Sequence, residues 1–261
     1  HGDVVNRGPR SDAVWDIIAD ARDERWIVTA GNHERYVYTH HTDPANVAQG
    51  LMARVHQTSR FAFEQLGSRV TEIVGLADGV SLDVDGLGEA RVVHASMEGD
   101  EAGLDPGTPG ETAAARVGAP CEVLVVGHIH QRLDFRVGST RVVNAGSVGS
   151  SCDGVRAAGW VELEATPHGW KVDLRRVAYD VDAAARDIHA SGFLEGGGPV
   201  AALVAREWEL AAPVVRPWFR RELSRVRAGE VELEASVRSF LDAHRHRPPA
   251  PRFEALMSAA V

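Results

Sequence analysis

The feature that most constrains this chain is a design shared by four separated segments. Each is an apolar strand that ends in a short loop carrying Asp, Asn or His. In open α/β sheets, the loops that follow the carboxyl ends of the strands meet in one crevice. We therefore expect a shared polar site at one end of a sheet. The four segments are Gly2-Asp3, Gly31-Asn32-His33-Glu34, Val92-Val93-His94 and Gly127-His128-Ile129-His130.

These loops carry side chains that bind divalent metal ions. Imidazole and carboxylate together suit Zn, Fe, Mn and similar ions. The pair His128 and His130 can direct both rings at one ion or at two adjacent ions, and Asp3 has two oxygens that can bridge them. Two cations about 3.5–4 Å apart clamp a phosphoryl group and activate a bridging water. We also expect Glu34 to orient His33 through a hydrogen bond.

Taken alone, each of these residues has a plainer interpretation. Asp3 and Asn32 follow glycines and suit tight turns. His94, at the end of an expected strand, suits a partly buried histidine with an ordinary hydrogen bond. Their occurrence together and in this order favours the metal site.

The order of the expected elements indicates a mixed sheet architecture of α/β or α+β type. We expect a helix capped by Ser11, a buried strand at 26–30 and a broken helical region at 46–66. Strands and hairpins fill the middle of the chain, and helices close it. The expected strands are 80–84, 90–93, 122–126, 135–137, 141–143, 159–163 and 170–174, and the expected closing helices are 182–190, 200–211 and 217–242.

Composition excludes several classes of protein. The chain is 44% apolar and 25% charged, which is typical of a globular protein. A net charge of −9 argues against bulk nucleic-acid binding, and no apolar run approaches the roughly 18 residues that a membrane span needs. Two cysteines, Cys121 and Cys152, cannot build a disulfide framework. We therefore expect a cytoplasmic protein. We expect Cys121, beside an apolar strand, to be a small core residue, and Cys152, after the Gly-Ser-Val-Gly turn, to be inert although this turn places it near the site.

Five motifs resemble those of the calcineurin-like metallophosphoesterase superfamily, in its bacterial phosphodiesterase and diadenosine tetraphosphate hydrolase-like branch. They are Gly-Asp-Val-Val-Asn-Arg-Gly-Pro at 2–9, Gly31-Asn32-His33-Glu34, His94, Gly127-His128-Ile129-His130 and Asn-Ala-Gly-Ser-Val-Gly at 144–149. The resemblance implies a four-layer sandwich in which two facing mixed β-sheets are flanked by helices. It places the metallophosphoesterase domain at 1–180 and a C-terminal helical extension, packed on the same domain, at 181–261.

The resemblance also implies two divalent metal ions, with Mn, Fe, Zn, Ni and Co as candidates. By the matching motif positions, Asp3 bridges both ions and His130 binds the first. The second ion takes Asn32, His94 and His128. A hydroxide that bridges the ions would attack a phosphomonoester or phosphodiester.

Two further residues have catalytic roles implied by the resemblance. His33 donates a proton to the leaving group or stabilises the transition state. Arg7 contacts a phosphate oxygen through its planar guanidinium, and a surface ion pair is the alternative for this residue. We expect a small phosphate ester or a nucleotide as substrate. The run Gly-Asp-x-Val-x-Arg-Gly-Pro is also similar to diadenosine tetraphosphate hydrolases and protein Ser/Thr phosphatases, which stay open as alternatives.

The sequence departs from the family at its start. The family has an Asp-x-His motif, at the end of its first strand, before Gly-Asp, and this motif supplies two ligands of the first metal. Here nothing precedes His1, so we expect that the printed chain starts inside a domain and lacks the first strand. A catalytically dead binding module, or a purely structural protein, is the alternative to an enzyme. We expect the helices within 200–242 to pack on the sheet edge, with a dimerisation or lid element, and hence a homodimer, as the alternative.

Overall fold

A five-stranded mixed sheet forms the centre of the structure, a computed structural model that describes residues 1–23 and 26–253. The three inner strands β2, β3 and β5 run parallel, and the outer strands β1 and β4 pair antiparallel to them. The order across the sheet is β1 (Gly79–Val84), β2 (Gly88–Val93), β3 (Val123–Val126), β5 (Thr140–Ala145) and β4 (Arg132–Val137). The carboxyl ends of the inner strands therefore lie at the same end of the sheet.

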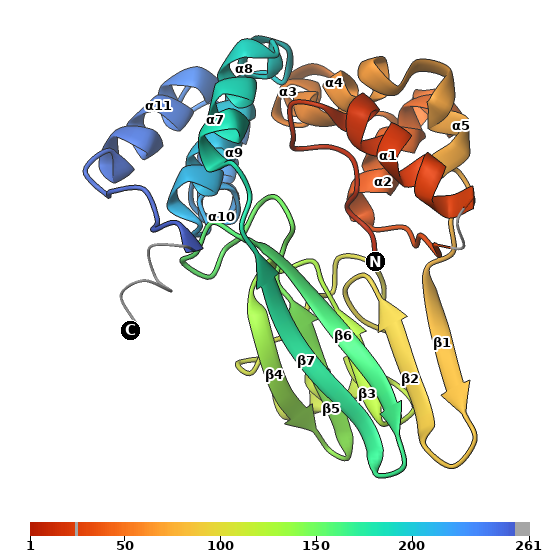
Figure 1. Cartoon of the computed structure of the whole chain (residues 1–261). Helices are drawn as coiled ribbons and strands as arrows, with labels where there is room; N and C mark the ends of the chain where they lie inside the picture. Colours follow the sequence, from red (N-terminus) through yellow and green to blue (C-terminus); the bar gives the residue numbers. More distant parts are fainter. Residues whose placement is uncertain (24–25, 254–261) are drawn as a thin grey trace.

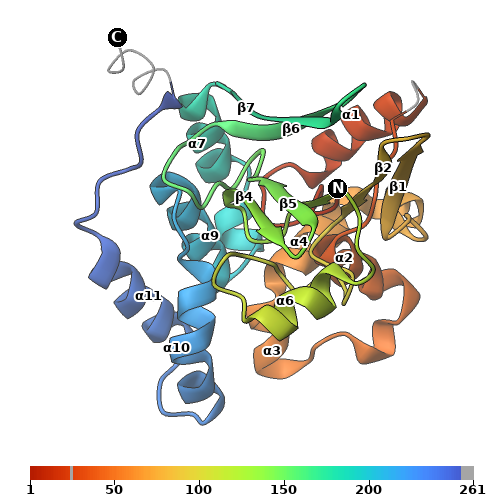
Figure 2. The ribbon, with the colours of Figure 1, turned by 90° about the horizontal axis from the view of Figure 1, so that it is seen from below.

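A second, two-stranded sheet covers one face of the first. It is the antiparallel hairpin β6 (Ala158–Thr166) and β7 (Gly169–Val177), whose Val161, Leu163 and Val172 pack against buried side chains of the inner strands. Helix α6 (Gly110–Val117) packs on the opposite face through Ala113 and Val117. Figure 2 shows α6 and the hairpin on opposite sides of the larger sheet. Two facing sheets flanked by helices are thus confirmed.

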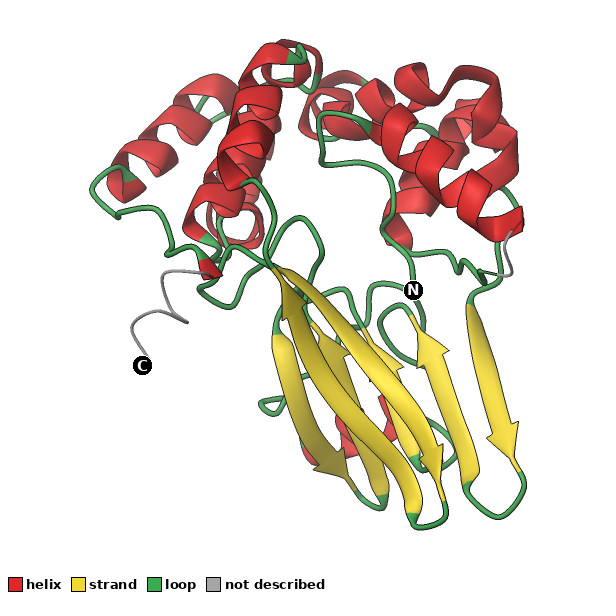
Figure 3. Cartoon of the chain, viewed as in Figure 1, coloured by secondary structure: helices red, strands yellow, loops and turns green. Residues whose placement is uncertain are grey.

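The remaining helices gather beyond one end of the strands in two groups (Figures 1 and 3). The N-terminal group packs around a small core that contains Trp15, Val37 and Ile73. Its helices are α1 (Ser11–Asp23), α2 (Asn32–Thr42), α3 (Gly50–Val55), α4 (Gln57–Leu66) and α5 (Val70–Ile73), with single 3₁₀ turns at Pro44–Asn46 and Gly67–Arg69.

The C-terminal group has the largest apolar core of the structure. Trp218 and Phe193 lie at its centre, and Val55 of α3 contributes to it. The C-terminal helices therefore pack on one another and against the N-terminal helices, where we expected the sheet edge. They are α7 (Val181–Ala190), α8 (Phe193–Gly196), α9 (Pro199–Leu210), α10 (Val215–Arg227) and α11 (Leu233–His244).

Three local predictions were wrong. Residues 26–30 form no strand: Thr29 makes a single bridge to Ala77, and Ile27 is 66% exposed. An apolar run becomes a strand only where a neighbour pairs with it, and the described residues supply only this bridge. The region 217–242 is two helices, because the chain turns at Gly229 with a φ of 72°. Ser11 begins α1, but its hydroxyl accepts the Asn6 N–H.

The other expected strands and helices are present within a few residues of their expected bounds. Among the described helices, none has the length and apolar character that a membrane crossing requires.

Candidate metal centre

Three separate parts of the fold bring a group of polar side chains together. His94 follows β2, and His128 follows β3, so both lie at the end of the sheet where the parallel strands finish. Asp3 belongs to the N-terminal loop, which runs past that end of the sheet. One ligand atom from each of these three residues lies within 4.8 Å of the others. The sequence pattern predicted this meeting of strand-end loops.

Asn32, the first residue of α2, completes the group. Its Oδ1 lies 3.0 Å from Nε2 of His94 and 3.1 Å from Nδ1 of His128. Asn32 and His94 are both buried, with 4% of their surface exposed. We refer to Asp3, Asn32, His94 and His128 as the Asp3 cluster.

The hydrogen bonds around His94 indicate that lone pairs face one another in this cluster. Nδ1 of His94 lies 3.0 Å from the carbonyl oxygen of His1, which can only accept, so Nδ1 carries the proton. Nε2 is then an acceptor, and it faces Oδ1 of Asn32 at 3.0 Å and Oδ2 of Asp3 at 3.3 Å. Buried acceptors that converge without a donor repel one another, and a cation between them removes the repulsion. The donor set therefore fits a divalent ion.

Glu34 fixes the loop that carries Asp3. Its carboxylate, which is fully buried, accepts four backbone N–H groups, from Asp3 at 2.7 Å, Val4 at 2.6 Å, Val5 at 3.0 Å and Gly31 at 2.7 Å. We expected Glu34 to orient the His33 ring, and this prediction was wrong. A carboxylate can satisfy several N–H donors at once, and the donors nearest to Glu34 are those of the distant Gly2-Asp3 loop.

The cluster also depends on backbone conformations that few residues adopt. Asp3 has a φ of 57° and His128 a φ of 65°, both in the left-handed region. At Gly31, an added Cβ would lie 2.7 Å from the backbone nitrogen of Asp3 and 2.8 Å from Nδ1 of His94. Only glycine at this position allows α2 to approach the cluster so closely.

Asn144 links the fifth motif to the cluster. At the end of β5, its side chain is fully buried and donates to the carbonyl oxygen of Gly127 at 2.7 Å, while its Oδ1 accepts the N–H of Gly146 at 2.9 Å. It therefore holds the loop that presents His128, and it lies beside the cluster as the motif order led us to expect.

His33 lies beside the cluster, and its Nε2 is 3.8 Å from Oδ2 of Asp3. Burial lowers the pKa of His33 to about 3; the charge of Asp3 opposes this shift and that of Arg7 adds to it. The imidazole is therefore neutral at neutral pH. Burial would raise the pKa of Asp3, but the neighbouring His33 and His94, together with the backbone N–H of His33 that donates to Oδ1 of Asp3 at 3.0 Å, lower it well below its usual range. Asp3 is therefore a carboxylate, the form that binds metal ions.

Arg7 has no ion-pair partner among the residues that the structure describes. It lies in a left-handed turn with a φ of 49°, and its backbone N–H donates to Oδ1 of Asn6 at 2.7 Å. Its positive charge lowers the pKa of both His33 and His130, so it lies near enough to act on both rings. The alternative of a surface ion pair finds no support in the described residues.

His130 belongs to a different group of side chains. Its ligand atom lies within 4.8 Å of those of Cys152 and Glu207, and the three residues come from three separate segments of the chain. From the sequence we expect His130 at the first metal and an inert Cys152, and no motif marks Glu207. A glutamate on a helix has no motif to mark it, so only the fold could bring it to His130.

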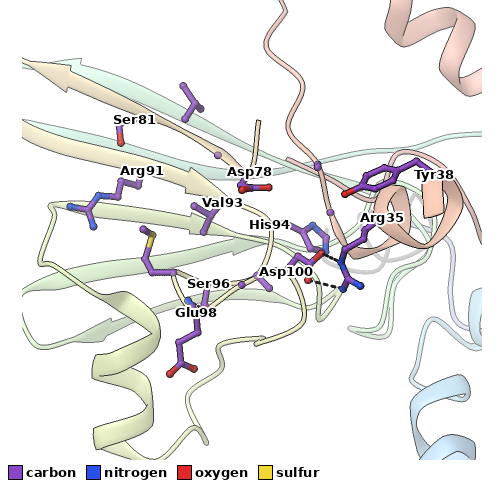
Figure 4. A pocket seen from close by; sticks show the side chains of 17 residues that line it. Arg35, Tyr38, Asp78, Ser81, Arg91, Val93, His94, Ser96, Glu98 and Asp100 are labelled. Carbon is purple, nitrogen blue, oxygen red and sulfur yellow. Dashed lines mark hydrogen bonds and ion pairs between the residues drawn. The ribbon is translucent and has the colours of Figure 1, made fainter. Parts of the chain in front are cut away.

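A cavity of about 560 Å³ borders the Asp3 cluster on the side of His94 (Figure 4). Its walls come from β1, β2, the start of α2 and the loop after His94. Arg35 of α2 donates to Asp100 of that loop at 2.8 Å and 2.9 Å, and also pairs with Glu101. These ion pairs join the loop to α2 beside the cavity, whose lining includes Arg35 and Asp100.

Comparison with solved structures identifies the fold. A metallophosphoesterase from Sphaerobacter thermophilus is 20% identical, with a TM-score of 0.58 over 81% of this chain and 87% of that one. A hypothetical protein from Pyrococcus horikoshii OT3 is 21% identical, with a TM-score of 0.60 over 77% of this chain and 82% of that one. No family model and no curated protein matches the sequence. These likenesses show that the chain has the metallophosphoesterase fold.

Proposed function

We propose that this protein is a metal-dependent phosphoesterase whose catalytic centre is the Asp3 cluster. The observation that carries the proposal is the convergence of Asp3, Asn32, His94 and His128, with acceptor atoms facing one another at the end of the parallel strands. The metallophosphoesterase fold supports the same assignment. Sites in α/β proteins form at this end of the sheet, because loops from several strands meet there.

Asp3, Asn32, His94 and His128 would hold a divalent ion of the Mn, Fe, Zn, Ni or Co type. Such an ion acts as a Lewis acid on a phosphoryl oxygen and lowers the pKa of bound water. Their mixture of carboxylate, amide and imidazole suits these metals better than Ca²⁺ or Mg²⁺, which prefer oxygen ligands alone. Asp3 carries the negative charge that the ion requires, and its low pKa keeps that charge at neutral pH.

His33 and Arg7 would act on the substrate itself. Because the pKa of His33 is about 3, its ring is neutral and offers one N–H as a hydrogen bond. This favours stabilisation of the leaving oxygen, one of the two roles considered for His33, over transfer of a proton from an imidazolium. Arg7 would place its guanidinium against two phosphate oxygens, a geometry that its planar fork allows.

The narrower identity of the enzyme is part of the proposal. We infer a phosphodiesterase of the bacterial branch with a small phosphate ester or nucleotide as substrate, and a second ion near His130. A diadenosine tetraphosphate hydrolase and a Ser/Thr phosphatase-like enzyme are the alternatives. A panel of a dinucleoside polyphosphate, a cyclic nucleotide and a phosphopeptide separates the three by which compound is hydrolysed. The cytoplasmic location and the homodimer stay predictions.

The direct test is hydrolysis of bis(p-nitrophenyl) phosphate by the full protein after removal and return of Mn²⁺. We expect activity to require the metal and to fall at least about 100-fold in His128→Ala and in Asp3→Asn, as loss of a principal charge stabiliser should cause. His168→Ala, in the exposed turn between β6 and β7, is the matched control and should keep full activity. Turnover near that of the wild type in either cluster variant would refute the proposal. Metal binding without turnover of any substrate would favour the binding module.

A further inference from the structure

We propose that His130, Cys152 and Glu207 form a second metal site, one that contains a thiolate and prefers Zn²⁺. The site consists of donor atoms outside the Asp3 cluster. It rests on the ion near His130 that the proposed function includes, and it names the ligands and the metal of that ion; it does not depend on whether the Asp3 cluster hydrolyses phosphate esters. We refer to these three residues as the Cys152 cluster.

Three segments of the fold form the Cys152 cluster. His130 comes from the loop after β3, Cys152 from the loop between β5 and β6, and Glu207 from α9. One ligand atom of each lies within 4.8 Å of the other two. An imidazole, a thiol and a carboxylate from three distant segments meet at one point, so the arrangement depends on the tertiary fold.

Hydrogen bonds orient the histidine and the cysteine. Nδ1 of His130 lies 2.7 Å from the carbonyl oxygen of Ser150, which can only accept, so Nδ1 carries the proton and Nε2 keeps its lone pair. The backbone N–H of Cys152 donates to the carbonyl oxygen of His130 at 2.8 Å. The two loops therefore hold each other, and a metal-binding histidine is commonly oriented by such a contact of its other nitrogen.

Glu207 supplies a buried negative charge. It is 5% exposed, and no Lys, Arg or His pairs with it among the described residues. Its Oε2 accepts the N–H groups of Val214 at 2.8 Å and Val215 at 3.0 Å, at the start of α10. Its other oxygen has no protein donor in that part of the chain. A buried carboxylate that lacks a cationic side chain is stabilised when a metal ion lies beside it.

The mixture of donors indicates the metal. Zn²⁺ binds Cys sulfur, His nitrogen and carboxylate oxygen in tetrahedral sites, whereas harder ions avoid thiolates. Three protein ligands leave the fourth position for water or another ligand. On binding, the Cys152 sulfur forms a bond to the metal, and the thiol proton passes to solvent. No electron transfer is involved.

Cobalt(II) reports on this site directly, because a thiolate bound to Co²⁺ gives a charge-transfer band in the near ultraviolet. We would titrate the metal-free full protein with Co²⁺ in the presence of a phosphine reductant. The band should appear in the wild type and in Cys121→Ser, and Zn²⁺ should abolish it by displacement. It should be absent from Cys152→Ser. Cys121 is the matched control, because it is buried just before β3 and its thiol donates to the carbonyl oxygen of Val123.

Two further variants separate the clusters. Glu207→Gln keeps an oxygen for the N–H groups of α10 but loses the charge, and should weaken Co²⁺ binding at least about tenfold. Asp3→Asn should leave the band intact even where hydrolysis is lost, so failure of the proposed function and failure of this proposal are distinguishable. If Cys152→Ser does not fold, alkylation of the wild type replaces it: Zn²⁺ should protect Cys152 from iodoacetamide in a mass-spectrometric assay. No band in the wild type, a band that persists in Cys152→Ser, or alkylation unaffected by Zn²⁺ would overturn the proposal.

Discussion

The loop after β3 contributes to both clusters: His128 belongs to the Asp3 cluster and His130 to the Cys152 cluster. The fold nevertheless assembles the two clusters in different ways. The Asp3 cluster is formed by loops at the end of the parallel strands and by the start of α2. The Cys152 cluster takes its carboxylate from α9, in the C-terminal group of helices. The first therefore depends on the sheet and the second on the docking of α9. One loop can serve two chemical environments, because alternate residues point in different directions.

A buried glutamate supports each cluster, and the comparison of the two explains their roles. Both oxygens of Glu34 accept backbone N–H groups, whereas Glu207 engages only Oε2 in this way. Glu34 therefore has no lone pair directed at the metal and acts by positioning Asp3. Glu207 has an oxygen left for an ion. The number of backbone N–H groups that the carboxylate accepts therefore distinguishes Glu34, which positions Asp3, from Glu207, which can bind a metal ion.

The largest effect should come from Glu34→Gln. The amide keeps the size of the side chain but places an NH₂ group against backbone N–H donors, so buried donors lose their acceptor. We expect a loss of about 3–5 kcal/mol in the free energy of unfolding, measured by urea denaturation. Glu207→Gln can turn its NH₂ away from α10 and should lose only about 1–2 kcal/mol. Equal losses in the two variants would contradict the distinction between the glutamates.

A smaller effect should follow from acidification of the metal-free protein. The folded protein holds His33 at a pKa of about 3 through burial, whereas the unfolded chain has an ordinary histidine pKa of about 6.5. Between these values the unfolded state binds more protons, so the free energy of unfolding falls as the pH falls. From pH 7 to pH 5 we expect His33 to contribute a loss of about 2 kcal/mol.

Urea denaturation at the two pH values, on the wild type and on His33→Gln, checks this prediction. The variant has no titrating ring at this position, so its stability should depend less on pH than that of the wild type. An identical pH dependence in both proteins would show that His33 is not held neutral by the fold.

The smallest effect should come from Arg7→Lys, which tests whether Arg7 serves the substrate of the Asp3 cluster. Lysine keeps the positive charge but loses the planar fork that contacts two phosphate oxygens. We expect the KM for a phosphodiester to rise about tenfold, with metal affinity at both clusters unchanged. A change in metal affinity without a change in KM would assign Arg7 to the metal sites.

Half of the Asp3 cluster could be predicted from strands, because His94 and His128 follow apolar strands whose carboxyl ends lie at the same end of the sheet. His94 and His128 need only that two adjacent parallel strands exist. The prediction of a strand at 26–30 was wrong because no neighbouring strand pairs with it among the described residues. Its apolar residues favour a strand, but pairing depends on a neighbour, and Thr29 has a single bridge to Ala77 among the described residues.

The functions of Glu34 and Glu207 could not be predicted from local sequence. Glu34 accepts N–H groups from a loop about thirty positions earlier in the chain, and the backbone N–H is the same whatever the side chain. Glu207 reaches Cys152 only once α9 has packed into the C-terminal core. Motif spacing therefore predicts neither the contact of Glu34 with the Asp3 loop nor that of Glu207 with Cys152, because both depend on how distant elements pack.

The most direct test of the central claim is an anomalous-difference map from crystals of the full protein soaked in Mn²⁺. A strong peak bounded by the side chains of Asp3, Asn32, His94 and His128 is the predicted result, in contact with Oδ1 of Asn32 and Nε2 of His94. A map with no peak there, or with manganese only beside His130, would contradict the claim that these four side chains form a metal centre.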